Sequence, residues 1–174
     1  MKKLYYLFFI LYTSSLQAQR IGVSTTAIYN GELQLMHVVP SLTMQHLKSE
    51  LELGVGFHPF INPHQTLLSG ELIYKNYPNG NNEKFNFYFL GHLSFVSNKR
   101  NYYYPTRYNY FFLAGGYGFD IKVSKNIYLG TNFSYGVNTF QKKSTVPYES
   151  FSRIEFFEEF NTHLGCQFKL GYRF

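Results

Sequence analysis

The residues best suited by type and spacing to catalysis are His92 and Ser94, which flank Leu93. Residues two apart in a strand point to the same face, so this imidazole lies where a general base must lie to activate a hydroxyl nucleophile. Such a site also needs a carboxylate to orient the base, and none is obviously placed in the sequence. The competing interpretation is a hydrogen-bonded pair without catalysis, which we favour.

Other reactive residue types show no productive spacing. Two of the six histidines, His58 and His64, are near each other only because they share a proline-containing segment. We therefore expect no metal site and no cofactor. The single Cys166 cannot form an intramolecular disulfide and is expected to act as a small hydrophobic residue.

The composition bounds the class of protein. The chain has 174 residues, of which 45% are hydrophobic, 15% charged and 21% aromatic, with 17 Tyr and 19 Phe. These values exclude a disordered chain, a disulfide scaffold and a helical membrane bundle, and the length fits one domain. Frequent aromatic residues separated by short Ser, Asn and Gly intervals favour an all-β fold.

The elements that must position these residues are strands. Over residues 163–174 an apolar residue alternates without exception with a polar residue or glycine, which indicates a strand of twelve residues. Similar alternation predicts seven more strands, and Pro40 indicates a bulge or a local break in the second, whose phase is mixed. The eight expected strands are 21–29, 32–44, 49–57, 65–76, 85–96, 111–122, 127–138 and 163–174.

The first residues are typical of a secretory signal peptide. Lys2 and Lys3 precede an apolar run at 4–12, and the small residue Ala18 suits cleavage before Gln19. We therefore expect a signal peptide at 1–18 and a mature domain at 19–174, with a net charge of 14 − 10 = +4 once the two lysines are removed. A retained membrane anchor is the alternative, although the run is short for a bilayer span. Export also argues against a nucleic-acid partner, which the basic and aromatic residues could otherwise accommodate.

Volume decides which face of the strands points outward. An eight-stranded barrel has an interior just wide enough for side chains to fill, and the apolar face carries too many Phe, Tyr and Leu side chains to fit. The opposite face carries eight of the fourteen glycines, which suits a crowded lumen. The apolar face must then meet lipid; the alternative is a soluble lipocalin-like barrel with that face inside.

With its alternating strands and its end Phe168-Lys169-Leu170-Gly171-Tyr172-Arg173-Phe174, the chain resembles the small eight-stranded outer-membrane β-barrel proteins of diderm bacteria. The resemblance implies an all-β, eight-stranded, antiparallel, up-and-down transmembrane barrel that follows a cleaved signal peptide and lies in the outer membrane as a monomer. It also implies that the barrel-assembly machinery recognises the last strand through its alternate apolar residues: Phe168, Leu170, Tyr172 and Phe174. The termini and the segments 45–48, 77–83 and 123–126 would face the periplasm, and 97–107 and 141–159 would form surface loops.

Eight charged residues are expected on the lumen face toward the periplasmic half. Four acids meet four bases there, which favours an ion-paired plug because a selective pore would carry one sign of charge. A small gated pore is the alternative. The eight residues are Glu50, Glu52, Glu71, Lys75, Asp120, Lys122, Lys169 and Arg173.

The expected surface loops are rich in basic residues, and three consecutive tyrosines at 102–104 are expected in a membrane-interface girdle. The bases could contact phosphates of outer-membrane lipids and lipopolysaccharide, or they could be solvated without a partner. The candidate contacts are Lys99, Arg100, Arg107, Lys142 and Lys143, and Arg153 also lies in the last loop.

The sequence as a whole favours a non-enzymatic outer-membrane barrel with a structural or surface-interaction role. Some barrels of this size acylate or deacylate lipid A, and one deacylase family uses a His-x-Ser pair with a carboxylate. Here Phe95 replaces the Asn that follows Ser in that family, and the His92 face is the expected lumen. A lipid-modifying enzyme is therefore the alternative from another class.

Overall fold

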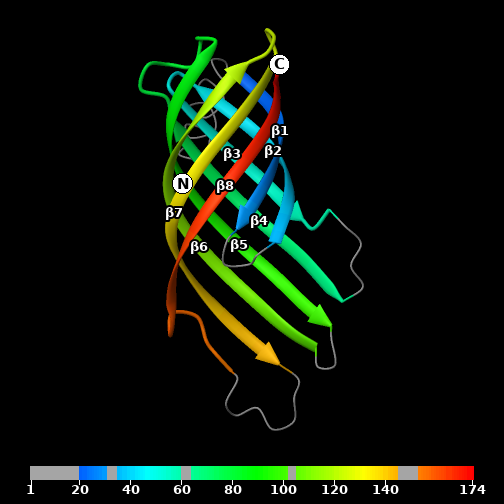
Figure 1. Cartoon of the computed structure of the whole chain (residues 1–174). Helices are drawn as coiled ribbons and strands as arrows, with labels where there is room; N and C mark the ends of the chain where they lie inside the picture. The colour runs from blue at the N-terminus through cyan, green and yellow to red at the C-terminus, as the bar shows by residue number, and fades with distance from the viewer. Residues whose placement is uncertain (1–19, 31–34, 60–63, 102–104, 145–152) are drawn as a thin grey trace, which may run out of the picture.

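A computed structural model describes residues 20–30, 35–59, 64–101, 105–144 and 153–174. Each strand pairs antiparallel with its sequence neighbours, and the first also pairs with the last, which closes the sheet (Figure 1). The predicted eight-stranded up-and-down barrel is confirmed. The strands are β1 (Arg20–Asn30), β2 (Leu35–His46), β3 (Ser49–Phe57), β4 (Gln65–Asn76), β5 (Phe85–Asn101), β6 (Pro105–Lys122), β7 (Ile127–Ser144) and β8 (Phe160–Arg173).

The two ends of the barrel differ. At one end residues 47–48 connect β2 to β3, 77–84 connect β4 to β5, and 123–126 connect β6 to β7. The C-terminus lies there too, where the Phe174 backbone N–H donates to the Ile21 carbonyl at 3.0 Å. We call this the turn end and the opposite one the loop end, where β5, β6 and β7 extend beyond the rest of the wall (Figure 1). The expected signal peptide lies outside the described residues.

Burial alternates along the strands in the predicted phase. In β5 the even-numbered residues from Asn86 to Asn98 are buried, whereas the odd-numbered residues from Phe85 to Phe95 are exposed. The last strand behaves likewise, since Phe168 is 64% exposed and Lys169 only 3%. The apolar face therefore points outward, and the lipocalin-like alternative is wrong.

Glycines make room inside the barrel. A Cβ atom on the inward-facing Gly171 would overlap the ring of Tyr128, and one on Gly136 would overlap Ala114. The outward-facing Gly70 and Gly91 would meet no atom within 4 Å. The inner glycines thus let large side chains fill the lumen, as the volume argument predicts.

Two expectations about strand boundaries need correction. Residues 97–101 and 105–107 belong to β5 and β6, and 141–144 belong to β7, so most of the expected first surface loop and the start of the second are strand. The outward residues become polar once the strands pass the apolar band, whereas inward residues such as Tyr108, Tyr110 and Phe140 are aromatic. The apolar pattern of the outer face therefore ends there although the backbone pairing continues. The three tyrosines at 102–104 lie outside the described residues.

The second strand keeps a single phase. His37, Val39 and Thr43 are buried, whereas Leu42 and Met36 point outward. No bulge interrupts the register, because Val38 pairs with Phe57 and Ser41 with Gly54 in the same alignment. The expected local break is present, since residues 39 and 40 have no paired residue in β3. Pro40 has no N–H to donate, which explains the break.

The outward apolar band has the height of a bilayer core. On β5 it runs from Phe85 to Phe95, and the paired outward residues of β6 run from Ile121 to Phe111. At a rise of ~3.4 Å per residue and a strand tilt of ~40°, this stretch covers roughly 26 Å, close to the ~25 Å band of membrane barrels. No helix among the described residues has the length and hydropathy of a membrane span.

Candidate functional site

Six of the predicted lumen charges meet in one network near the turn end. Glu50 lies at its centre, where one carboxylate oxygen accepts from Lys75 Nζ at 2.9 Å and the other from Arg173 Nη2 at 2.8 Å. Both Glu50 and Lys75 are fully buried. Because strands β3, β4 and β8 supply these three side chains, the network links opposite parts of the wall across the lumen.

Glu52 forms a second centre in the same network. Its carboxylate pairs with Lys169 and lies 3.6 Å from Lys75 Nζ. The hydroxyls of Ser24 and Thr26 donate to it at 3.1 and 3.4 Å. Glu52 is the only carboxylate in the described part of the chain that forms an ion pair with Lys169.

Asp120 completes the charge balance with help from buried tyrosines. It lies 3.4 Å from Arg173 Nη2 and accepts a 2.7 Å hydrogen bond from the Tyr77 hydroxyl. Burial raises the pKa of Tyr77 well above its usual value, so the phenol keeps the proton that it donates. The guanidinium of Arg173 also stacks 4.0 Å from the ring centroid of Tyr128. Three carboxylates therefore face three cations in the closed network.

Two predicted members lie elsewhere. Lys122 is half-buried at the end of β6 and forms no ion pair with any described residue. It lines a hollow of about 330 Å³ at the turn end, together with Arg20 and Lys125. Glu71 lies nearer the middle of the lumen, where it has partners of its own.

Glu71 binds two histidines that sequence reasoning did not assign to it. It lies 3.3 Å from His37 Nε2 and 2.7 Å from His92 Nε2, and all three residues are buried. The other ring nitrogen of His92 faces the Gln167 amide at 3.4 Å. The mixed phase of β2 concealed His37, and only the strand register brings Glu71 opposite Ser94 and beside His92.

This arrangement corrects one expectation and bears on the enzymatic alternative. A carboxylate is placed beside His92 after all. However, Glu71 and Gln167 occupy both ring nitrogens of His92, so neither is directed at the hydroxyl of Ser94. Ser94 is also buried in the lumen, 5% exposed, away from the outer face that lipid would reach. The geometry is that of a structural hydrogen-bond network.

The lumen becomes apolar toward the loop end. Leu67, Val96 and Phe112 are 1–3% exposed, and Tyr110 packs with them. The Tyr110 ring stacks on that of Phe112, with centroids 5.7 Å apart. The inside of the barrel therefore has three successive zones: charged groups near the turn end, the Glu71 network in the middle and this apolar cluster toward the loop end.

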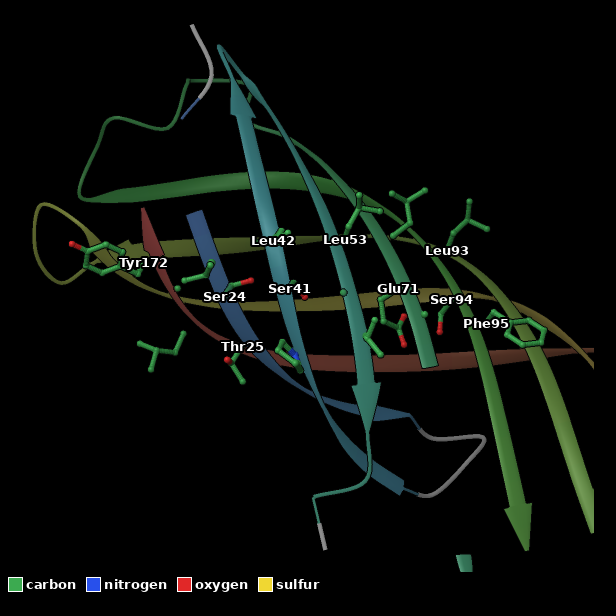
Figure 2. A pocket seen from close by; sticks show the side chains of 18 of the residues that line it. Ser24, Thr25, Ser41, Leu42, Leu53, Glu71, Leu93, Ser94, Phe95 and Tyr172 are labelled. Atoms are coloured by element: carbon green, nitrogen blue, oxygen red, sulfur yellow. The ribbon is translucent and has the colours of Figure 1, made fainter. Parts of the chain in front are cut away.

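A hollow of about 1070 Å³ is lined mainly by apolar side chains on the outside of the wall. Leu42, Leu53 and Leu93, which are 36–60% exposed, project from one side of the strands in Figure 2. Gly70 also lines it, between its paired residues Val55 and Phe95. Some inward residues, among them Ser24, Ser41, Glu71 and Ser94, contribute to its floor between the strands (Figure 2). It is a shallow depression of the apolar band.

The candidate lipid-contact residues divide between the two faces. Lys99, Arg107 and Lys143 are exposed and share the outward phase of their strands. Arg100 and Lys142 have the inward phase, and Arg100 stacks over the Tyr108 ring at 5.1 Å. Sequence reasoning placed all five in loops, so it could not separate them.

The expected assembly signal lies along the outer face of the strand that closes the barrel. Phe168, Leu170 and Tyr172 are 41–64% exposed, and Phe174 just beyond β8 is 73% exposed. β8 pairs with β1 on one side and with β7 on the other. No group of His, Cys, Asp and Glu side chains suited to a metal ion is found in the described ranges.

Comparisons with known proteins identify the fold. No protein-family model and no curated protein matches the sequence. Solved structures do match: the N-terminal β-barrel domain of Pseudomonas aeruginosa OprF has a TM-score of 0.60 at 13% identity, covering 89% of this chain and 97% of that one. A major outer membrane protein from Thermus thermophilus has a TM-score of 0.58 at 14% identity, covering 90% of this chain and 100% of that one. Neisserial surface protein A has a TM-score of 0.54 at 11% identity, covering 90% and 96%. The chain thus has the fold of small eight-stranded outer-membrane β-barrels, as its terminal pattern indicates.

Proposed function

We propose that this protein is an integral outer-membrane barrel whose lumen is plugged and whose role is structural or one of surface interaction. The observation that carries the proposal is the combination of an outward apolar band with a lumen in which charged groups are paired. Glu50, Glu52, Lys75 and Asp120 are at most 1% exposed, which leaves little room for an aqueous path.

The location is inferred from several features together. Two of the similar structures are described as a surface protein and an outer membrane protein. The signal-peptide pattern at 1–18 supports export, and the exposed aromatic residues of β8 support recognition by the barrel-assembly machinery. Short turns would face the periplasm, and the loop end would face the outside. Closure between β1 and β8 leaves no open sheet edge among the described strands, which favours a monomer.

A non-enzymatic role fits the lumen better than the lipid-modifying alternative does. His92→Ala and Ser94→Ala variants should therefore leave the acylation pattern of lipid A in the host membrane unchanged. Loss of an acyl-chain modification in both variants, with the barrel intact, would instead establish the enzyme.

The proposal is tested by membrane fractionation and by electrophoresis in SDS with and without boiling. A folded barrel should run differently before and after boiling, and it should be recovered with the outer membrane. A periplasmic protein whose mobility ignores boiling would overturn the proposal. In planar bilayers the purified protein should show no unitary conductance beyond that of a denatured sample. Discrete conductance steps would mean that the lumen is a small pore and is not plugged.

A further inference from the structure

Three basic residues at the loop end stand in one row across three strands. Lys99 of β5 pairs with Arg107 of β6, and Arg107 pairs with Lys143 of β7. All three side chains are exposed on the outward face. Neighbouring strands are ~4.8 Å apart, so the three cationic groups are distributed over roughly 10 Å.

No described carboxylate forms an ion pair with the row, and the one acid that interacts with it at longer range is Glu155, which lies near Lys143. Directly opposed like charges destabilise a sheet, and the β4 residue paired with Lys99 is the neutral Thr66. The nearby acid, Glu155, pairs instead with Arg153 at 2.6 Å. Hydrogen bonds from Gln141 and Arg153 lower the pKa of Glu155, so it stays ionised. Because no described carboxylate forms an ion pair with the row, an external anion would relieve its repulsion.

The height of the row matches that of lipid headgroups. The apolar band ends at the paired residues Phe95 and Phe111. The next outward-facing pair along these strands is polar: Ser97 donates to Asn109 at 3.0 Å. The outward-facing pair after that belongs to the basic row. Four residues at ~3.4 Å and a tilt of ~40° place the row roughly 10 Å above the end of the band, at the level of the headgroups.

An apolar surface lies directly below the row. Phe95 and Phe111 line the upper part of the outer hollow, which continues to Gly70. A molecule with a phosphate at one end and acyl chains at the other would contact the basic row and the hollow together. A soluble anion would meet only the row.

We propose that Lys99, Arg107 and Lys143 bind the phosphate groups of an outer-leaflet glycolipid whose acyl chains lie over Phe95 and Phe111. This inference rests on the proposed membrane location and adds a ligand class and a site to it. Arg107 provides a forked donor set for phosphate oxygens, and the two lysines add point charges on either side.

The test uses the full-length barrel in detergent, with binding of purified lipopolysaccharide measured by titration. The variant Lys99→Gln/Lys143→Gln removes two outward charges. Its matched control, Arg100→Gln/Lys142→Gln, removes two charges from the neighbouring positions of the same strands, on the inner face. We expect about a tenfold loss of affinity in the first variant and less than about twofold in the second, because exposed charge contacts are individually modest.

Two further probes separate the sources of phosphate. Lipopolysaccharide whose phosphates have been removed by hydrolysis should bind the parent protein weakly. Its affinity should be about that of intact lipopolysaccharide for the Lys99→Gln/Lys143→Gln variant. Inorganic phosphate at the same concentrations should not compete. Equal effects of the two double variants, tight binding of the dephosphorylated lipid, or displacement by inorganic phosphate would each overturn the proposal. Mobility in SDS before and after boiling is recorded for every sample. This distinguishes a folded barrel that does not bind lipopolysaccharide from a protein that does not form a barrel.

Discussion

Replacing Glu52 by leucine should destabilise the barrel strongly, because Glu52 provides the ion pair of Lys169. Both side chains are only 1% exposed. Removing one partner of a buried ion pair typically costs about 3–5 kcal/mol, since the remaining charge is left without compensation. The unpaired Lys169 ammonium has no other described carboxylate in ion-pair contact, so we expect Glu52→Leu to fall in that range.

The reverse change should cost less. In Lys169→Met the Glu52 carboxylate keeps Lys75 at 3.6 Å and the donated hydrogen bond of Ser24 at 3.1 Å. We expect a loss of about 1–3 kcal/mol. The double variant Glu52→Leu/Lys169→Met removes both charges while Lys75 keeps Glu50, so it should be at least about 2 kcal/mol more stable than Glu52→Leu alone.

The assay is equilibrium unfolding in urea with the barrel refolded into phospholipid vesicles, followed by the mobility of the folded band on unboiled gels. The free energy of unfolding is compared for the parent, both single variants and the double variant. A loss below about 1 kcal/mol for Glu52→Leu would refute the reasoning, because buried pairs are expected to exceed exposed ones. So would a double variant whose loss equals the sum of the two single losses.

Three further changes test the packing, the membrane contact and the assembly signal. Gly171→Ala should cost about 1–3 kcal/mol because its Cβ would overlap the Tyr128 ring, whereas the outward Gly91→Ala should be close to neutral; equal losses in urea unfolding would contradict the filled lumen. Tyr117→Arg, near the middle of the apolar band, should cost about 2–4 kcal/mol in lipid vesicles, and a neutral effect would mean that this face does not meet hydrocarbon. Deleting Phe174 should lower the amount of folded barrel in the outer membrane of cells while leaving refolding of the purified chain unchanged; normal assembly in cells would exclude Phe174 from the signal.

Register explains why part of the lumen could be predicted and part could not. Period-2 alternation identifies the side of the sheet on which each charged residue lies, and Glu50, Lys75 and Arg173 therefore meet inside as expected. Alternation does not give the height of a residue along the barrel. Lys122 has the inward phase but lies at the end of its strand, where it pairs with none of the described acids.

The Glu71 network likewise depends on the register of strands that are not neighbours in sequence. Its partners come from β2 and β5, which flank the β3–β4 hairpin on opposite sides. His37 was hidden because apolar residues occupy both phases of its strand, so nothing local marks it as an inward residue. A histidine is identified as a partner only when the stagger of neighbouring strands is known, and the closed barrel sets that stagger.

The sequence by itself determined the number of strands, the outward face of every strand except the second and the crowded glycine-lined lumen, because one buried face imposes an alternation that twelve residues can display. Tertiary structure alone decided how far β5, β6 and β7 continue, since their outward residues are polar beyond the apolar band and the apolar-outward alternation ends there. It also decided that Lys99, Arg107 and Lys143 form a row while Arg100 and Lys142 turn inward, because cross-strand register is a property of paired strands and is not written in any one of them.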